Sequence, residues 1–221
     1  MKKKKLKRRN KKIFKLLIII FILVFFGVLT VNVYNIFNKK EDNHVDEPKY
    51  TLESSFPDNV YGVPVYTDLV SVNGLSRTGD LRKIKYIVIH ETANELKGAT
   101  AKNHANYLKN NNDSATSWHY TVDENEIYHH IPDNEIANHA GNHEGNLYGV
   151  GIELCINKGS NFEKTKDNAE KLVAYLLKEY NLKISDVKMH RDFSGKDCPH
   201  NIIKDNSFKQ FKNKVVNYYN S

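Results

Sequence analysis

Two histidines and one cysteine occupy positions where a fold can bring reactive side chains together. His90 follows the apolar run YIVI at residues 86–89, which has the pattern of a buried strand. His190 ends a second short strand pattern at residues 187–190, and Cys198 follows in the loop sequence HRDFSGKDC. Strand ends and loops of α/β folds carry reactive groups because a rigid scaffold holds them within reach of solvent. Two imidazoles and one thiolate can fill three positions of a tetrahedral zinc ion and leave the fourth for water.

The spacing of these three residues is a weak signal by itself. A single histidine is more often a surface residue or a satisfied core residue than a metal ligand. Two further side chains have equally ordinary interpretations on their own, since Glu153 can form a buried ion pair and Lys196 can be a solvated loop charge. In an exported chain, a disulfide between Cys155 and Cys198 is also a natural suspicion.

The elements that must position these residues alternate between strands and helices. Short apolar runs at 86–89, 150–156 and 187–190 predict buried strands, and residues 118–122 and 126–131 flank a turn that predicts a hairpin. Helices are predicted at 100–108 and 165–180, and a capping box at 207–210 predicts the start of a last helix. The expected fold class is α/β (α+β), with a mixed central β-sheet flanked by helices. The two amphipathic helices are expected to face inward with Ala169, Leu172, Val173, Leu176 and Leu177, and with Phe208, Phe211, Val215 and Tyr218.

The charge is divided unevenly along the chain. The 221 residues carry a formal charge of +7, but residues 1–40 hold 12 Lys and Arg and no Asp or Glu, so the remainder has a net charge of −5. A basic surface for nucleic acid across the domain is therefore not expected. A hydrophobic content of 40% excludes wholesale disorder.

The N-terminal segment has the pattern of a membrane anchor. A basic tail at residues 1–15 precedes the uncharged run at 16–37, whose 22 residues span about 33 Å as a helix. The flanking basic residues predict a single-pass protein of the cell membrane with a cytoplasmic N-terminus and an extracellular domain. A cleaved signal peptide is the alternative, but no convincing cleavage site follows the run. A polar linker is predicted at 38–58, and a folded domain at 59–221.

Five motifs in order carry a family resemblance. They read YIVIHETAN, SWHYTVDENEIYHHIP, HAGN, VGIELCIN and MHRDFSGKDCPH. Together they resemble the zinc-dependent N-acetylmuramoyl-L-alanine amidases of the type-2 family, which includes phage endolysins and is related to the peptidoglycan-recognition proteins. The resemblance covers residues 84–219 and implies the corresponding fold, a Zn²⁺ cofactor and peptidoglycan as the substrate.

The resemblance also implies roles for individual residues. The family's zinc ligands fall on His90, His190 and Cys198, and its catalytic glutamate and lysine fall on Glu153 and Lys196. Zinc would lower the pKa of a bound water to about 7 and polarise the scissile carbonyl. Glu153 would then act as general base and acid, and Lys196 would stabilise the oxyanion. As a ligand, Cys198 would not be available to pair with Cys155, so the expectation is one free buried thiol and no internal disulfide.

The resemblance also places further histidines and a tryptophan. His139 corresponds to a substrate-side histidine, and Trp118 and His119 to a wall of the cleft. Four others, His129, His130, His143 and His200, are expected either along the groove or, by preference, at the surface.

Three classes of function follow from these residues. The first is a membrane-tethered, monomeric zinc amidase that cuts the bond between N-acetylmuramic acid and L-alanine of the stem peptide. The second is a non-catalytic peptidoglycan-binding module of the same fold, and the third is a membrane protein that senses wall fragments. Because non-catalytic relatives lose the third ligand, Cys198 favours the enzyme.

Overall fold

The computed structural model describes residues 56–72 and 74–221. The predicted basic tail (1–15), the predicted anchor (16–37) and all but the last three residues of the predicted linker (38–58) lie outside this range. Within the part of the chain that is described, no helix is both long enough and apolar enough to cross a membrane.

A seven-stranded sheet forms the centre of the described residues. Its order is β1-β2-β5-β4-β6-β3-β7, and the four neighbours β4, β6, β3 and β7 run parallel to one another. The strands β5 and β1 are antiparallel to their neighbours β4 and β2, so the sheet is mixed, as predicted. The strands are β1 (Asn59–Val60), β2 (Val63–Thr67), β3 (Tyr86–Glu91), β4 (Tyr120–Val122), β5 (Ile127–His129), β6 (Gly149–Leu154) and β7 (Val187–Met189).

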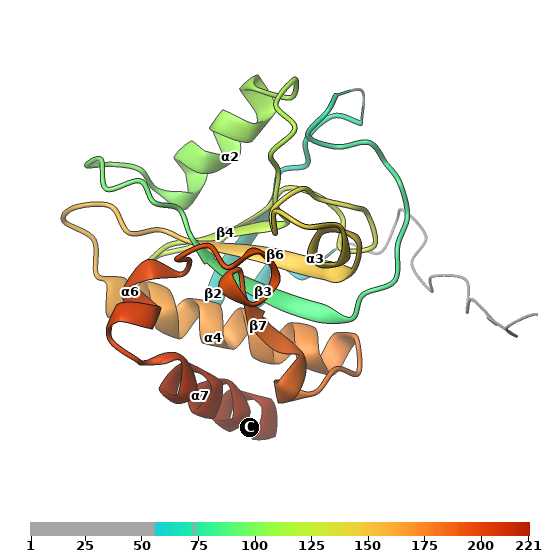
Figure 1. Ribbon diagram of the computed structural model, residues 1–221. Coiled ribbons are helices and arrows are strands. Elements are labelled where there is room, and N and C mark those ends of the chain that lie inside the picture. The colour runs from blue at the N-terminus through green and yellow to red at the C-terminus, as the bar shows by residue number, and fades with distance from the viewer. Residues whose placement is uncertain (1–55, 73) are drawn as a thin grey trace, which may run out of the picture. The chain divides into compact units, whose positions relative to one another are not determined.

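Helices cover the two faces of this sheet unequally. The long helix α4 and the C-terminal helix α7 pack together on one face, whereas α2 lies on the other (Figure 1). The helices are α2 (Ala101–Asn110), α3 (His143–Tyr148), α4 (Phe162–Glu179), the 3-10 turn η1 (Ile184–Asp186), α5 (Arg191–Ser194), α6 (His200–Lys204) and α7 (Phe208–Asn220).

The main hydrophobic core lies between the sheet and α4. Ile87 and Ile89 of β3 point into this core, as do Val150 and Ile152 of β6. The five residues predicted for the inward face of α4 are all buried, and so are Phe211 and Val215 of α7. Since side chains alternate along a strand, Val88 and His90 must point to the opposite face of the sheet. The core packing therefore directs His90 away from α4 and toward the α2 side.

One local prediction is wrong. Ser207 precedes α7 but its side chain does not cap that helix, and its hydroxyl instead donates to the carbonyl of Ile202 at 3.4 Å. The chain enters α7 from the end of α6 only a few residues earlier, so the hydroxyl is taken up by the preceding turn. Elsewhere α2 and α4 do begin at side-chain caps, from Thr100 and Asn161 respectively.

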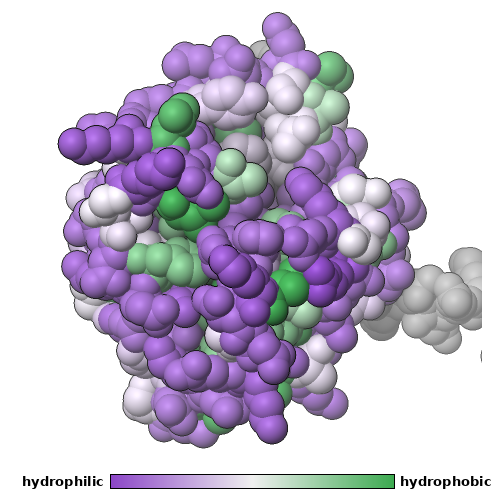
Figure 2. Space-filling model, turned by 60° about the vertical axis from the view of Figure 1, so that its left-hand side comes forward, coloured by the Kyte–Doolittle hydropathy of each residue, from purple (hydrophilic) through white to green (hydrophobic). Residues whose placement is uncertain are grey.

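Apolar side chains reach the surface in small separate areas. The face in Figure 2 is mostly hydrophilic, with a few isolated hydrophobic spots. Tyr66 and Tyr107 are about half exposed, and Leu96 is 74% exposed in the loop before α2.

Candidate metal centre and active site

Two neighbouring parallel strands place His90 and Glu153 side by side. In the register of β3 and β6, His90 pairs with Glu153, and both residues follow the alternation that directs Ile89 and Ile152 into the core. Their side chains therefore share the face of the sheet opposite α4. The His90 Nδ1 atom lies 3.9 Å from Glu153 Oε1.

The segment after β7 brings the other two predicted ligands to the same place. His190 directly follows β7 in the sequence. Because β7 lies next to β3, the backbone N–H of His190 reaches the carbonyl of Ile89 and donates to it at 3.2 Å. The chain then makes the short helix α5 and returns, so that the carbonyl of Cys198 accepts from the N–H of Arg191 at 3.0 Å. This return carries the Cys198 thiol back to the end of β3.

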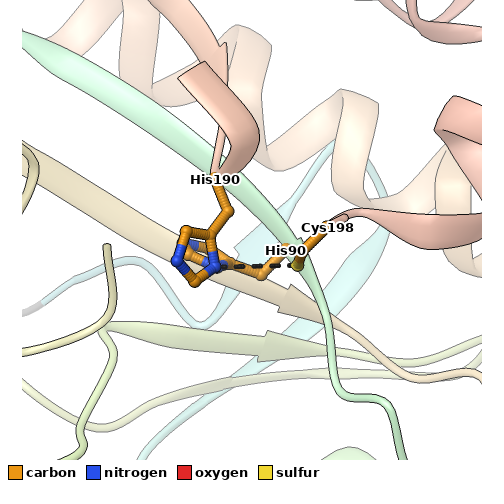
Figure 3. Close-up of side chains that lie close together, drawn as sticks. All are labelled: His90, His190 and Cys198. Atoms are coloured by element: carbon orange, nitrogen blue, oxygen red, sulfur yellow. Dashed lines mark hydrogen bonds between the residues drawn. The ribbon is translucent and has the colours of Figure 1, made fainter. Parts of the chain in front are cut away.

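The three predicted ligands meet in a compact cluster (Figure 3). His90 Nδ1 lies 3.0 Å from His190 Nδ1 and 3.9 Å from Cys198 Sγ, and the three ligand atoms all lie within 4.8 Å of one another. All three side chains are buried. Around a tetrahedral zinc ion, two nitrogen ligands are separated by ~3.3 Å and a nitrogen and a sulfur ligand by ~3.6 Å. The cluster therefore has the size of a zinc site.

The hydrogen bonds around His90 suit a cation. Burial lowers the pKa of His139 to about 3, so its ring is neutral. Its Nε2 lies 2.9 Å from the carbonyl oxygen of Gly149, which can only accept, so Nδ1 is left to accept from His90 Nε2 at 3.0 Å. His90 thus turns a bare Nδ1 toward His190 and Cys198.

Burial also keeps the other two predicted ligands, Cys198 and His190, uncharged. It raises the pKa of the Cys198 thiol to about 12 and lowers the pKa of His190, so neither group is charged on its own at neutral pH. Two neutral imidazoles and a thiol with their donor atoms turned inward are the chemistry of a structural or catalytic zinc site. The residues present therefore fit Zn²⁺.

Glu153 is a partly buried acid beside this cluster, with its side chain 16% exposed. Burial raises its pKa to about 8, against the opposing effect of the positive charge of Lys196, and its Oε2 has no hydrogen-bond partner among the described residues. Lys196 itself is exposed on the loop before Cys198, and its charge also acts on His90 and His190. An acid with a perturbed pKa and a nearby cation are typical of a catalytic site.

The structure places His139, which the resemblance assigns to the substrate side, directly against a predicted ligand. Its ring is buried, and its two nitrogens are hydrogen-bonded to the carbonyl of Gly149 and to His90. Two glycines make room for the ring, since a Cβ at Gly151 would lie 2.6 Å from the His139 ring and one at Gly149 would lie 3.3 Å from it.

Trp118 and His119, which the resemblance assigns to a wall of the cleft, are both buried. His119 is fully buried, and its Nδ1 accepts from the N–H of Gly151 at 3.0 Å. Trp118 is 7% exposed, and its indole N–H donates to Thr121 Oγ1 at 2.7 Å. The preferred surface positions of His129 and His130 are wrong. His129 is the last residue of β5 and His130 follows it, and both side chains are buried.

Glu91 has a structural role that the sequence does not reveal. Its carboxylate accepts from the backbone N–H groups of Asn201 and Ile202 and from the Asn201 side chain, at 2.9–3.1 Å. These bonds tie the start of α6, just after Cys198, to the end of β3, just after His90. Its partners Asn201 and Ile202 lie 110 and 111 residues away along the chain, so no local pattern could have identified them.

Both cysteines are free and buried. Cys198 belongs to the cluster with His90, whereas Cys155 packs with Ala101, Ala105 and Tyr128 beneath α2.

Comparison with known proteins extends this geometry. The model of a family described as N-acetylmuramoyl-L-alanine amidase matches residues 80–201, more than half of the 221-residue chain. The chain belongs to this amidase family. The matched segment contains the three residues of the cluster together with Glu153 and Lys196.

Two curated relatives come from Bacillus subtilis (strain 168). The amidase CwlH is 43% identical over 144 residues, covering 64% of this chain and 57% of CwlH. The amidase XlyA is 43% identical over 143 residues, covering 64% of this chain and 48% of XlyA. The chain therefore spans about half the length of these relatives.

A solved structure of the catalytic domain of XlyA has the same fold. It superposes with a TM-score of 0.66 and 41% sequence identity, covering 69% of this chain and 99% of that domain. The half of XlyA that the chain matches is thus its catalytic part.

Proposed function

We propose that this chain is a zinc-dependent amidase that hydrolyses the bond between N-acetylmuramic acid and the L-alanine of the peptidoglycan stem peptide. The observation that carries the proposal is the buried cluster of His90, His190 and Cys198 beside Glu153, in a chain of the N-acetylmuramoyl-L-alanine amidase family. The names of the relatives CwlH and XlyA supply the bond.

His90, His190 and Cys198 hold the metal in this proposal. Zinc bound there supplies a Lewis acid that makes water more acidic and polarises a carbonyl group. Glu153 accepts a proton from the attacking water and delivers it to the nitrogen of the leaving alanine. The buried position of its carboxyl group suits this double role, because burial brings its pKa to about 8, close to neutrality.

Lys196 contributes a positive charge beside Glu153. Its side chain is exposed, yet its charge lowers the pKa of Glu153, so it lies near enough to act on charges that develop there. We propose that it stabilises the oxyanion formed when the scissile carbonyl is attacked.

The test combines zinc content with digestion of purified peptidoglycan. Mass spectrometry of the products should show free L-alanine N-termini from the wild-type chain. Glu153→Gln keeps the size of the side chain and removes its basicity, so it should retain zinc and lose about 10²–10⁴-fold in turnover. His90→Ala and Cys198→Ser should lose both zinc and activity.

Several outcomes contradict the proposal. Full activity of the Glu153→Gln variant would exclude the general-base role. A wild-type chain that binds wall and zinc but releases no L-alanine would instead be a binding module. Products cut at a sugar linkage or at another peptide bond would assign a different hydrolase activity.

We also propose that residues 16–37 anchor the chain in the cell membrane, with the N-terminus in the cytoplasm and the catalytic domain outside. The uncharged run and its basic flank support this topology. The full chain should sediment with membranes after a high-salt wash, and a variant lacking residues 1–37 should not. Protease added to intact cells should cleave the domain, and its protection would refute the orientation.

We propose a monomer as the working unit, because the three ligands and Glu153 all come from one chain. Light scattering of the detergent-solubilised chain should give the mass of one protein copy, and a stable dimer would contradict this proposal.

A further inference from the structure

In the sequence, the two-residue segment His139–Ala140 lies between the two predicted histidine ligands, His90 and His190. It follows the hairpin of β4 and β5 and precedes α3, so it belongs neither to β3, which contains His90, nor to β7, which directly precedes His190. The segment nevertheless lies against both rings: His139 Nδ1 is hydrogen-bonded to His90 Nε2 at 3.0 Å, and a Cβ added at Gly141, which follows Ala140, would lie 3.6 Å from His190 Nε2. One short segment therefore touches two ligands that are 100 residues apart in sequence.

The first of these contacts determines which nitrogen His90 presents. The chain of bonds runs from the Gly149 carbonyl through the His139 ring to His90 Nε2, with separations of 2.9 and 3.0 Å. Each neutral ring has one N–H and one bare nitrogen, and the carbonyl at the start of the chain fixes the direction of every bond. His90 Nδ1 is consequently the free donor atom.

The second contact acts on His190 in the same sense. The Nδ1 atom of His190 faces His90 Nδ1 at 3.0 Å, so its Nε2 is on the opposite edge of the ring. This edge lies against the chain directly after Ala140, because a Cβ added at Gly141 would lie 3.6 Å from His190 Nε2. Both histidines thus turn Nδ1 toward each other.

Asn146 holds the segment in place. Its side-chain Oδ1 accepts from the backbone N–H of His139 at 3.0 Å and from that of Ala140 at 2.7 Å. Its own backbone N–H is bonded within α3, to the carbonyl of Asn142 at 3.1 Å. A single amide oxygen therefore fixes the two residues that orient both ligands.

We propose that His139–Ala140, clamped by Asn146, is a positioning element that makes both His90 and His190 bind zinc through Nδ1. The inference rests on the proposed zinc site and adds the residues that set its ligand atoms. Hydrogen-bond partners of metal-bound histidines fix the tautomer and the ring orientation, and their loss weakens metal binding about 10–100-fold.

Variants at Asn146 separate this role from general stability. Asn146→Leu removes the acceptor at similar volume, whereas Asn146→Asp keeps an oxygen that can accept both backbone N–H groups. We expect zinc affinity, measured by competition with a chromophoric chelator on the full chain, to fall about 10–100-fold in the leucine variant and to be largely retained in the aspartate variant. His139→Phe, which keeps a ring without nitrogens, should resemble the leucine variant.

A spectroscopic measurement tests the ligand atoms directly. In ¹⁵N-histidine protein loaded with ¹¹³Cd²⁺, the wild type should show cadmium coupling to Nδ1 of both His90 and His190. Coupling to Nε2 of either residue would overturn the inference, as would unchanged zinc affinity in both Asn146→Leu and His139→Phe. Circular dichroism and thermal unfolding of the metal-free variants check that each one folds.

Failure of the proposed function gives a different result. If the wild-type chain itself binds no zinc, the metal site is wrong. If the wild type binds zinc tightly and the two variants do so equally, the zinc site stands and the positioning element is refuted.

Discussion

Gly151→Ala should weaken metal binding although residue 151 touches no ligand. Gly151 lies on β6 beneath the ring of His139, and an added Cβ would lie 2.6–2.9 Å from three atoms of that ring. Ordinary contacts of a Cβ begin near 3.4 Å, so the ring must move by roughly 0.5–0.8 Å. The methyl group stands on a rigid central strand, so His139 is the part that gives way.

The consequence can be estimated from the bond that His139 makes. His139 Nδ1 is 3.0 Å from His90 Nε2, and a movement of this size takes the pair beyond the usual limit of ~3.2 Å. We expect zinc affinity to fall about 10–100-fold, because His90 loses the partner that orients it. The overpacking itself should reduce the free energy of unfolding by about 1–3 kcal/mol.

Gly62→Ala is the matched control. Gly62 lies in the turn between β1 and β2 at a φ of +82°, with no atom within 4 Å of its added Cβ. Alanine there costs about 1–2 kcal/mol of backbone strain and leaves the site untouched. Urea unfolding and chelator competition on both variants should therefore show two destabilised proteins, of which only Gly151→Ala loses zinc affinity. Equal affinities in the two variants would refute the reasoning.

Three further changes test other parts of the structure. Burial raises the pKa of Glu170 to about 7 from 4.5, so the unfolded state releases this proton first and stability is lost as the pH rises between these values. Urea unfolding should find Glu170→Gln more stable than the wild type by up to about 3 kcal/mol at pH 8 and equal to it near pH 4, and an equal difference at both pH values would contradict this. Glu91→Ala leaves the N–H of Ile202 unpartnered and should lower the free energy of unfolding by about 3 kcal/mol; a neutral effect would mean that the tie to α6 contributes nothing. Non-reducing mass spectrometry of active protein should find Cys155 and Cys198 unlinked, whereas a bridge between them would exclude Cys198 as a ligand.

Patterns of neighbouring residues were enough to predict most of the fold. The inward face of α4, including Leu172 and Leu176, is set by a helical period, and burial of that face against the sheet is what holds the helix in place. Strands β3, β6 and β7 follow from short apolar runs, and the hairpin of β4 and β5 from its polar turn. The short helices α3, α5 and α6 were not predicted, because they have only four to six residues each and no apolar period.

The site divides in the same way. His90, His190 and Cys198 could be named from the sequence because ordered motifs carried them, and the structure brings those three residues together. The sequence did not reveal that His139 is hydrogen-bonded to His90, or that Asn146 accepts from the backbone N–H of His139. It also did not reveal that His119 is buried. These roles depend on which groups meet across the sheet.

The sequence by itself therefore determined which residues are chemically suited to a zinc amidase and which elements carry them, since both are properties of residue type and local period. The tertiary structure decided which nitrogen of His90 is free, and it did so through a carbonyl of β6, the ring of His139 and the space left by Gly151. A hydrogen bond between distant segments has a direction only when its partners are known, and a side chain fits only where its neighbours leave room. Both the hydrogen-bond partners and the space around a side chain depend on segments that are distant in the sequence, so neither could be predicted from the order of the residues.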